Sequence, residues 1–353
     1  MTDGWDFLRS YLRFRAMKKI KVSIIIPVYG VERYIERCAH SLFGQTMDDN
    51  IEFIFVNDCT KDRSIEILKN VIEKYPNRKD QVTIISHDKN MGLSTSRVTG
   101  IKASKGEYVV HCDSDDWVEH DMYQRMYEEA KNTDADIVGC DYWIETKTKS
   151  WVKKQDFRLP KEDMVYEMIY GDKIESYFWC RMFRRSLYNS DLYFADSDIG
   201  FLEDMAVVVP LHLAAKKIAY VGKPLYHYNK SNPKSITGSL CSHDIDSAFK
   251  VLDKLTSLNS ENKKILSALR WKAWDISTLL ITEEKVYDPI RWQNLNLYSP
   301  EFALSKRGKI GVLLVRLRLF KTNLLFQKIY KCLYRYKQSI LFKLHPKISV
   351  YDT

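Results

Sequence analysis

The sequence predicts an α/β protein with a mostly parallel sheet and helices on both faces, followed by a helical C-terminal extension. Two observations indicate this fold. From Val22 to Trp143, short runs of β-branched and apolar residues alternate with amphipathic segments long enough to form helices, and this alternation ends after Trp151. A chain of 353 residues has room for two domains, so we expect an α/β domain over residues 17–240 and a mainly helical, basic region over residues 241–353.

The first strand is the apolar run from Val22 to Ile26, which is followed by Pro27. An amphipathic helix is expected from Glu32 to Gly44. The next elements are expected as strands at residues 51–56, 82–85, 107–112 and 137–143, and as helices at residues 63–75, 94–104 and 121–131. After these we expect helices at residues 161–170, 174–189 and 202–217, a short strand at residues 218–220, and only helices from about residue 244.

The net charge of +9 is unevenly distributed along the chain. From residue 303 onward there are twelve lysines and arginines but one acid, Asp352. Bulky apolar residues are interleaved with these cations over residues 309–320 and 324–336, a pattern typical of basic amphipathic helices at an anionic membrane surface. The alternative is a pair of helices that packs on the protein with its charges in water. No RNA-binding signature accompanies the charge, so we expect no nucleic-acid partner.

Cysteine usage and hydropathy indicate the compartment. The seven cysteines are dispersed without a CxxC pair, which favours reduced thiols over a disulfide framework or a zinc site. No segment reaches the roughly 18–20 uninterrupted apolar residues that a membrane span needs, and residues 1–16 show no signal peptide. Residues 1–16 are either an extension before a true start at Met17 or a short amphipathic helix. We expect a cytoplasmic protein that is peripheral on the inner face of the cell membrane.

Three aspartates within four residues, Asp113, Asp115 and Asp116, directly follow the strand expected at residues 107–112. The carboxyl ends of strands are where open α/β sheets bind ligands. Clustered carboxylates repel one another unless a cation compensates them, and oxygen ligands of this kind suit Mg²⁺ or Mn²⁺, which usually arrive with phosphate. The alternative is a solvated acidic turn that caps the helix beginning near Glu119.

Two further loops are expected at the same edge of the sheet, one at residues 27–30 and one that contains Asp58 and Asp62. Asp58 can accept hydrogen bonds from a base or a ribose, whereas Asp62 is interpreted as a turn and helix N-cap residue. The third strand leads through Gly92 into a helix in which Arg97 would face this edge, within reach of a base carbonyl or a phosphate. The alternative is a surface arginine.

The order and spacing of these motifs resemble the family 2 glycosyltransferases, which have the GT-A fold. The resemblance covers roughly residues 20–235. It is carried by residues 22–29 (VSIIIPVY), 55–64 (FVNDCTKDRS), 90–94 (NMGLS), Arg97, Gly100, residues 106–108 (GEY) and residues 113–117 (DSDDW). The resemblance implies a Rossmann-like GT-A domain, a nucleotide-sugar donor, a UDP-sugar by preference, and a Mn²⁺ or Mg²⁺ cofactor.

The resemblance also implies roles for single residues. The implied nucleotide-binding residues are Pro27, Tyr29, Asp58, Arg97 and Asp113. Asp115, together with Asp113, would hold the divalent metal that bridges the diphosphate. His227 would be a third metal ligand or a diphosphate contact, and its alternative is a histidine packed between tyrosines. Diphosphate or sugar contacts are implied for Arg181, Asp116 and Lys230. Residues 224–230, which end with Lys230, and residues 235–237 match a loop that closes over the donor.

Glu203 and Asp204 match an acidic pair that the family carries near the start of an acceptor-side helix. An inverting transfer needs a general base on the face opposite the leaving group, to take the proton from the acceptor hydroxyl. We expect Asp204 to be this base, with Glu203 as the alternative. The structural alternative is two acids that are favourably placed in the first turn of a helix.

Together these features predict an inverting, metal-dependent glycosyltransferase that moves a hexose or N-acetylhexosamine to a hydroxyl of a glycan or lipid-linked glycan in surface-polysaccharide synthesis. A nucleotidyltransferase uses a similar sheet and a metal, but it would need a glycine-rich phosphate loop that residues 29–32 do not provide. A membrane-docked scaffold that binds nucleotide without catalysis is the third hypothesis.

Overall fold

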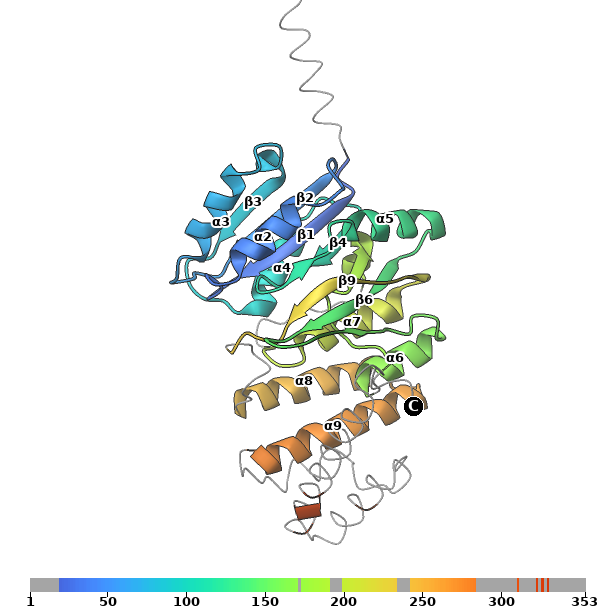
Figure 1. The fold of residues 1–353 in the computed structure, drawn as a ribbon. Helices are drawn as coiled ribbons and strands as arrows, with labels where there is room; N and C mark the ends of the chain where they lie inside the picture. The colour runs from blue at the N-terminus through green and yellow to red at the C-terminus, as the bar shows by residue number, and fades with distance from the viewer. Residues whose placement is uncertain are drawn as a thin grey trace, which may run out of the picture. The chain divides into compact units, whose positions relative to one another are not determined.

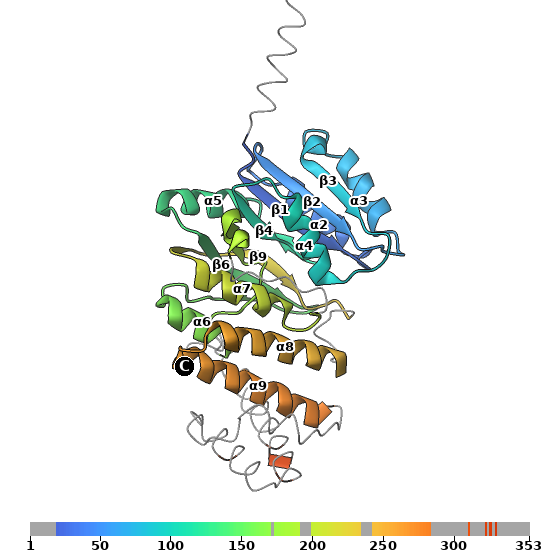
Figure 2. The ribbon, with the colours of Figure 1, turned by 180° about the vertical axis from the view of Figure 1, so that it is seen from behind.

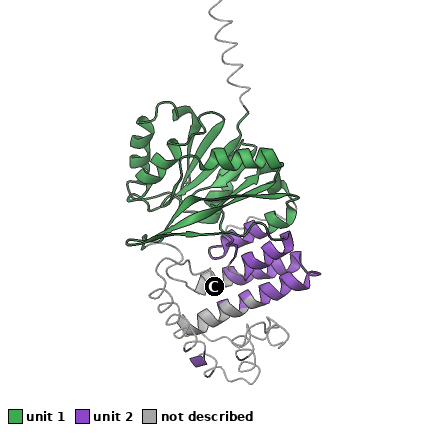
Figure 3. Cartoon of the chain, turned by 45° about the vertical axis from the view of Figure 1, so that its right-hand side comes forward, with its two compact units in different colours: residues 1–158, 177–197, 210–233 green, residues 159–176, 198–209, 234–353 purple. Residues whose placement is uncertain are grey.

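The computed structural model describes residues 19–170, 173–190, 199–233 and 242–283, together with five single positions beyond residue 309. Within the described residues the chain forms two compact units, which Figure 3 colours green and purple. Unit 1 comprises residues 1–158, 177–197 and 210–233, and unit 2 comprises residues 159–176, 198–209 and 234–353. The units therefore interleave along the chain, whereas the sequence suggested one boundary near residue 240. Residues 1–16, residues 235–237 and almost all of the basic tail lie outside the described residues.

Unit 1 begins with four parallel strands and the helices that connect them (Figure 1). These elements are β1 (Val22–Val28), α2 (Ile35–Phe43), β2 (Ile51–Asn57), α3 (Ser64–Glu73), β3 (Val82–Ser86), α4 (Leu93–Ala103) and β4 (Tyr108–His111). Strand β1 pairs in parallel with both β2 and β4, and β2 pairs in parallel with β3. The parallel α/β order predicted from the alternating sequence pattern is confirmed for this half of the sheet.

The rest of the sheet is mixed. It is built from β5 (Trp117–Val118), β6 (Ile137–Glu145), β7 (Ser150–Lys153), β8 (Arg181–Arg184) and β9 (Ile218–Asn229), with helix α5 (Met122–Thr133) leading into β6. The strand order is β3-β2-β1-β4-β8-β6-β9-β5, and β7 pairs with β6. Strand β8 is antiparallel to both β4 and β6, while β6 and β9 are parallel.

Alternate side chains of β1 enter two separate layers of core. Ile24 and Ile26 belong to a large buried cluster that also contains Leu42 of α2 and Leu68 of α3. Ile25 faces α4, where a Cβ atom added to Gly100 would lie 2.3 Å from the Ile25 side chain, so only glycine permits this close approach. Helices α2 and α4 consequently cover opposite faces of the sheet, as the two views show (Figures 1 and 2).

Unit 2 is helical in its described part. It contains α6 (Lys161–Ile169), the first part of α7 (Glu203–Ala214), α8 (Ser242–Leu258) and α9 (Lys263–Glu283). Helix α9 packs against both α6 and α8. Lys264 contacts Asp163 at the start of α6, which adds an ion pair to this packing. Among the described helices, none is both long and apolar enough to cross a membrane.

Two expected elements are wrong in kind or in length. The helix expected at residues 174–189 is absent there; the chain forms β8 and then a short 3₁₀ helix at Arg185–Asn189. This segment is a strand because it pairs with β4 on one side and with β6 on the other, both of which come earlier in the chain. The strand expected at residues 218–220 extends to Asn229, because it pairs with β6 along most of its length.

Candidate nucleotide-sugar site

Three loops that leave the carboxyl ends of parallel strands meet at one edge of the unit 1 sheet. Tyr29 follows β1, Asp58 follows β2 and Asp113 follows β4 within two residues. Strand β1 lies between β2 and β4, and the connections leave it in opposite directions. Such a reversal of strand order opens the crevice in which doubly wound sheets bind their ligands.

The loops after β1 and β2 are joined by hydrogen bonds. Gly30, with a φ of 71°, donates its N–H to Thr60 Oγ1 at 2.9 Å. Asp62 Oδ2 accepts the N–H of Glu32 at 3.0 Å, and its Oδ1 accepts the N–H of Ser64, the first residue of α3, at 3.1 Å. The interpretation of Asp62 as a turn residue is confirmed, since its carboxylate accepts the N–H of Ser64, whereas the N-cap position of α3 is taken by Arg63.

The Asp58 carboxylate organises the loop that follows β3. Its Oδ1 accepts hydrogen bonds from His87 Nδ1 at 2.8 Å and from the N–H of Met91 at 2.7 Å, while its Oδ2 accepts the N–H of Gly92 at 2.8 Å. Gly92 has a φ of 86°, as expected for the glycine before α4, and the helix starts at Leu93. Asp58 is almost fully buried, so these bonds fix both oxygens at the sheet edge.

Next to Asp58, the residues around the end of β1 differ sharply in exposure. Pro27 is buried within β1 and pairs with Val56 of β2. Tyr29 is 54% exposed although it is aromatic, and Met91 is 39% exposed. Large apolar side chains left open beside buried polar groups are typical of ligand sites.

Arg97 and Asp113 form an ion pair. Arg97 Nη2 lies 3.1 Å from Asp113 Oδ1, and the guanidinium lies 4.9 Å from the ring centre of Phe178. Arg97 is 4% exposed while the Asp113 side chain is 27% exposed. The alternative of a surface arginine is therefore wrong, and Arg97 holds the Asp113 carboxylate in place at the sheet edge.

Asp115 is partly buried and is held in place by polar neighbours. Its Oδ2 accepts a hydrogen bond from Asn232 Nδ2 at 2.8 Å, and its backbone oxygen accepts one from Arg37 Nη2 at 3.3 Å. Burial raises the pKa of Asp115 above its ordinary value, the Asn232 amide acts in the opposite direction, and the neighbouring Asp113 raises it further. A cation bound beside Asp115 would therefore be favourable, because it would offset the charges of Asp115 and Asp113.

Asp116 has a different environment, and the expected diphosphate or sugar contact is corrected. Its side chain is buried, with 1% of the residue exposed. The Oδ2 atom accepts the Tyr226 hydroxyl at 2.7 Å and Oδ1 accepts the N–H of Asn229 at 2.7 Å. Burial raises the pKa of Asp116 well above its ordinary range, and the charges of Asp115 and Asp113 act in the same direction. Asp116 therefore anchors its loop to β9.

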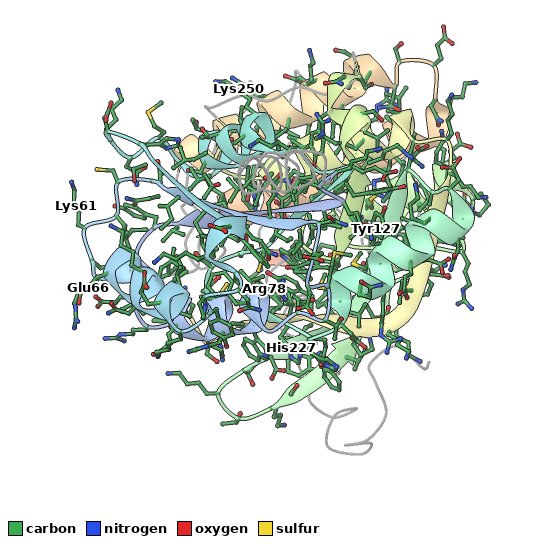
Figure 4. The ribbon with its side chains drawn as sticks, turned by 90° about the horizontal axis from the view of Figure 1, so that it is seen from above. Lys61, Glu66, Arg78, Tyr127, His227 and Lys250 are labelled. Atoms are coloured by element: carbon green, nitrogen blue, oxygen red, sulfur yellow. The ribbon has the colours of Figure 1, made fainter. Side chains whose placement is uncertain are left out.

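His227 does not face the aspartates, so its expected role as a metal ligand or diphosphate contact is corrected. Its Nδ1 lies 2.8 Å from Glu145 Oε1 and its Nε2 lies 3.1 Å from Glu119 Oε1, which leaves neither ring nitrogen for a metal. The imidazole is stacked between Trp117 and Trp143, with ring centres 4.9 and 6.0 Å away. Figure 4 labels His227 among the side chains of the protein. The packed alternative is confirmed.

Two other expected contacts have different outcomes. Arg181 is fully buried, donates from Nη1 to the Tyr177 carbonyl oxygen at 2.5 Å, and lies 5.0 Å from the ring centre of Phe157. A side chain with no exposed surface does not contact a bound nucleotide-sugar. The expected diphosphate or sugar contact of Arg181 is therefore corrected: its contacts lie within the protein interior. Lys230 is exposed at the end of β9, 5.6 Å from the ring centre of Tyr228, and its diphosphate or sugar role stays a prediction.

Glu203 and Asp204 form the first turn of α7 and belong to unit 2. The residue before them, Leu202, has a φ of 63°, a left-handed conformation that is strained for a bulky side chain. Ser247 Oγ of α8 accepts the N–H of Gly200 at 2.8 Å and so fixes the turn that leads to these acids. Their catalytic role stays a prediction.

Comparison with known proteins shows a similarity to one enzyme family. Residues 23–191 match the family model described as Glycosyl transferase family 2. This region of the chain is therefore similar to the family 2 glycosyltransferases. EpsJ of Bacillus subtilis (strain 168), described as an uncharacterized glycosyltransferase, is 38% identical over 222 residues, which cover 61% of this chain and 62% of EpsJ. The chain thus spans less than two thirds of this relative.

Two solved structures with bound nucleotide-sugars share the fold. TarS of S. aureus, in complex with UDP-GlcNAc, has a TM-score of 0.66 at 19% identity, covering 88% of this chain and 91% of the TarS chain. The mannosyltransferase PcManGT of Pyrobaculum calidifontis, in complex with GDP-Man and Mn²⁺, has a TM-score of 0.51 at 15% identity, covering 91% and 93%. At such identities the likeness establishes the fold alone, and the expected GT-A fold is confirmed.

The sequence assigned no role to four residues of the candidate site, two of which, Tyr226 and Asn229, lie in the matched segment 224–230. His87 supports Asp58, while Tyr226, Asn229 and Asn232 hold the aspartate loop. Nothing local in the sequence marks them, because each reaches its partner across a turn or from a distant strand. In the described part of the chain, no group of three or more histidine, cysteine, aspartate and glutamate side chains is arranged to hold a metal ion.

Proposed function

We propose that the chain is an inverting, metal-dependent glycosyltransferase that transfers a hexose or N-acetylhexosamine from a UDP-linked donor to a hydroxyl group. The main support is that Asp58 and the Asp113–Asp115 pair follow the two strands that flank β1, in a region similar to the family 2 glycosyltransferases. A nucleoside diphosphate offers a base, a ribose and two phosphates in a row. Acceptors for the base and ribose and carboxylates for a phosphate-bound cation are the groups such a ligand requires.

The two acids after β4 fit a Mg²⁺ or Mn²⁺ ion that binds together with a diphosphate. Such ions are commonly held by one or two carboxylates, with phosphate oxygens and water in the remaining positions. Asp115 is suited to this role because its burial and the neighbouring Asp113 make an uncompensated charge unfavourable there. When bound, the cation would stabilise the negative charge that develops on the departing diphosphate.

We assign the base to Asp58 and Tyr29 and the ribose to Asp113. The exposed ring of Tyr29 offers a flat face on which a base can stack. A carboxylate oxygen accepts up to two hydrogen bonds, so Asp58 Oδ2, which accepts one from Gly92, has capacity for a base N–H. Arg97 orients the Asp113 carboxylate, which is 27% exposed and can accept hydrogen bonds from ribose hydroxyls.

Asp204 is proposed as the general base, with Glu203 as the alternative. The strained Leu202 directly before this pair supports the assignment, since backbone strain persists where the surroundings hold a functional geometry. Deprotonation of the acceptor hydroxyl by Asp204 would accompany attack on the sugar carbon from the face opposite the diphosphate, which inverts the configuration.

The solved structures of similar fold suggest the nucleotide of the donor. The TarS structure contains UDP-GlcNAc and the PcManGT structure contains GDP-Man. The higher TM-score of TarS favours a UDP-linked donor for this chain. We propose a glycan or lipid-linked glycan of surface-polysaccharide synthesis as the acceptor. The basic region from residue 303 onward, which lies almost wholly outside the described residues, is proposed to contact an anionic membrane surface.

A donor screen tests the proposal. Purified protein is incubated with UDP-, GDP- and dTDP-sugars and Mn²⁺, and the released nucleoside diphosphate is measured by mass spectrometry. We expect release from a UDP-sugar that is lost on chelation and in Asp115→Asn, and that is kept in Asp134→Asn, a control at a side chain that is 88% exposed. Absence of release from every donor would contradict glycosyl transfer, and activity that survives both chelation and Asp115→Asn would contradict the metal dependence.

A further inference from the structure

Tyr226 of β9 joins two residues of the aspartate loop through one hydroxyl group. The hydroxyl donates to Asp116 Oδ2 at 2.7 Å and accepts the backbone N–H of Asp113 at 3.0 Å. Both loop residues lie more than a hundred positions earlier in the chain. Asp113 and Asp116 bracket Asp115, so this single oxygen fixes both ends of the segment that carries it.

The position of the Tyr226 hydroxyl is itself fixed by packing. Tyr226 is fully buried, and its ring is stacked on Trp179 with ring centres 4.4 Å apart and an angle of 14° between the planes. A buried ring between close-packed neighbours has little freedom to shift its hydroxyl. The Tyr226 hydroxyl therefore attaches the aspartate loop to a rigid part of the sheet.

The residues that follow Tyr226 extend the same attachment. The N–H of Asn229 donates to Asp116 Oδ1 at 2.7 Å, and Asn229 Nδ2 donates to the Asp115 backbone oxygen at 3.1 Å. Asn232 Nδ2 donates to Asp115 Oδ2 at 2.8 Å. The end of β9 thus contacts every aspartate of the loop, and Tyr226 is the fully buried residue among these contacts.

We propose that Tyr226 is a positioning residue, whose hydroxyl sets the place of the Asp113 and Asp115 carboxylates for a divalent cation bound with a nucleoside diphosphate. This inference rests on the proposed function, because it assumes that these carboxylates hold that cation. Carboxylates misplaced by a fraction of an ångström lose cation affinity, since small divalent ions demand near-ideal geometry. The contacts of the base with Asp58 and Tyr29 do not depend on Tyr226.

The same strand provides a matched control. The Tyr220 hydroxyl donates to Asp141 Oδ1 at 2.7 Å, which is the same kind of bond at the same distance. Asp141 is also buried, and its oxygen accepts the N–H of Gln155 as well. Tyr220→Phe therefore removes a tyrosine–aspartate hydrogen bond from β9 without touching the aspartate loop.

Calorimetric titration of UDP into the full-length protein, with and without Mn²⁺, tests the inference. Loss of two hydrogen bonds at the loop is expected to raise the Kd of UDP in the presence of Mn²⁺ by about tenfold in Tyr226→Phe. Without Mn²⁺ the Kd of UDP should rise by about threefold at most, because only the ribose contact of Asp113 is then displaced and the proposed base contacts remain. Tyr220→Phe should match the wild type in both titrations, while the two variants lower the Tm by similar amounts. A purely structural role would not produce this dependence on Mn²⁺.

Each remaining outcome decides between the claims. If wild-type protein binds UDP equally with and without Mn²⁺, the proposed function fails at its metal. If the wild type shows the Mn²⁺ effect and Tyr226→Phe retains it in full, only the positioning role of Tyr226 is overturned. If Tyr226→Phe does not fold, Asp116→Asn is compared with Asp141→Asn in the same titrations. A Mn²⁺ effect that Asp116→Asn leaves intact also overturns the inference.

Discussion

Asp113, Asp115 and Asp116 are near neighbours in the sequence, yet their carboxylates have different surroundings. Asp113 is paired with Arg97 and keeps part of its surface open, whereas Asp116 is buried against Tyr226. The sequence pattern predicted the acidic cluster and its place after β4. It could not rank its members, because the distinguishing partner is 110 residues away in the chain. The same limit applies to His227, whose partners Glu119 and Glu145 come from separate segments.

His87 supports Asp58 and is expected to affect nucleotide binding. Its Nδ1 donates to Asp58 Oδ1, and its Nε2 lies 2.9 Å from Thr99 Oγ1, so it holds the acid against α4. His87→Ala should raise the Kd of UDP by about fivefold in calorimetry, the cost of about one buried hydrogen bond. His40→Ala, which removes a histidine bonded to Tyr75, is the control and should bind like the wild type. An equal Kd of UDP for His87→Ala and His40→Ala would contradict the assignment of Asp58 to the base site.

Among the helices and strands, some are predictable from the local sequence pattern and others are decided by tertiary pairing. Strands β1 to β4 and their helices were predicted within a few residues, because each has the period or the apolar run of its class. Strand β8 was predicted as a helix because Arg181–Arg184 is too short to show a strand period. Its conformation is decided by pairing with β4 and β6, which a single segment does not reveal.

The start of α3 should show a pH-dependent contribution to stability. Partial burial raises the pKa of Asp62, but hydrogen bonds from Ser64, from the N–H of Glu32 and from Thr60 outweigh this and hold the pKa below its ordinary value. Because the folded-state pKa is lowered, the ionised carboxylate stabilises the fold above the unfolded-state pKa of about 4. This contribution is lost as the pH falls through the folded-state pKa.

Asp62→Asn is accordingly expected to lower the free energy of unfolding by about 1 kcal/mol at neutral pH. Urea unfolding should show a constant difference from the wild type down to about pH 5 and a narrower one below about pH 4. Asp88→Asn, at an exposed aspartate, is the control and should have little effect at either pH. A difference that does not change with pH would show that the Asp62 charge is not involved.

For the molecule as a whole, the net positive charge comes from the C-terminal end of the sequence. The +9 net charge is concentrated in the chain from residue 303 onward, next to apolar residues. If this region contacts lipid, full-length protein should sediment with vesicles that contain phosphatidylglycerol and not with pure phosphatidylcholine, and salt should weaken the binding. At about 1 kcal/mol per cation, changing Arg316, Arg318 and Lys321 to Gln should weaken vesicle binding by about a hundredfold.

A matched variant separates a local contact from a general effect of charge. Lys69, Lys102 and Lys105 are exposed in unit 1, and their change to Gln lowers the net charge by the same amount. This triple variant should bind anionic vesicles like the wild type. Equal weakening by both triple variants would indicate an effect of total charge, and no weakening by either would place the basic region away from the lipid.

The claim on which the account depends is that Asp113 and Asp115 hold a cation which in turn holds a diphosphate. Isothermal titration of UDP into wild-type protein and Asp115→Asn, with Mn²⁺ and with a chelator, measures this directly. We expect Mn²⁺ to tighten UDP binding to the wild type by about tenfold or more and to leave the affinity of Asp115→Asn unchanged. Equal affinity of the wild type in both solutions, or an undiminished Mn²⁺ effect in Asp115→Asn, would contradict this claim.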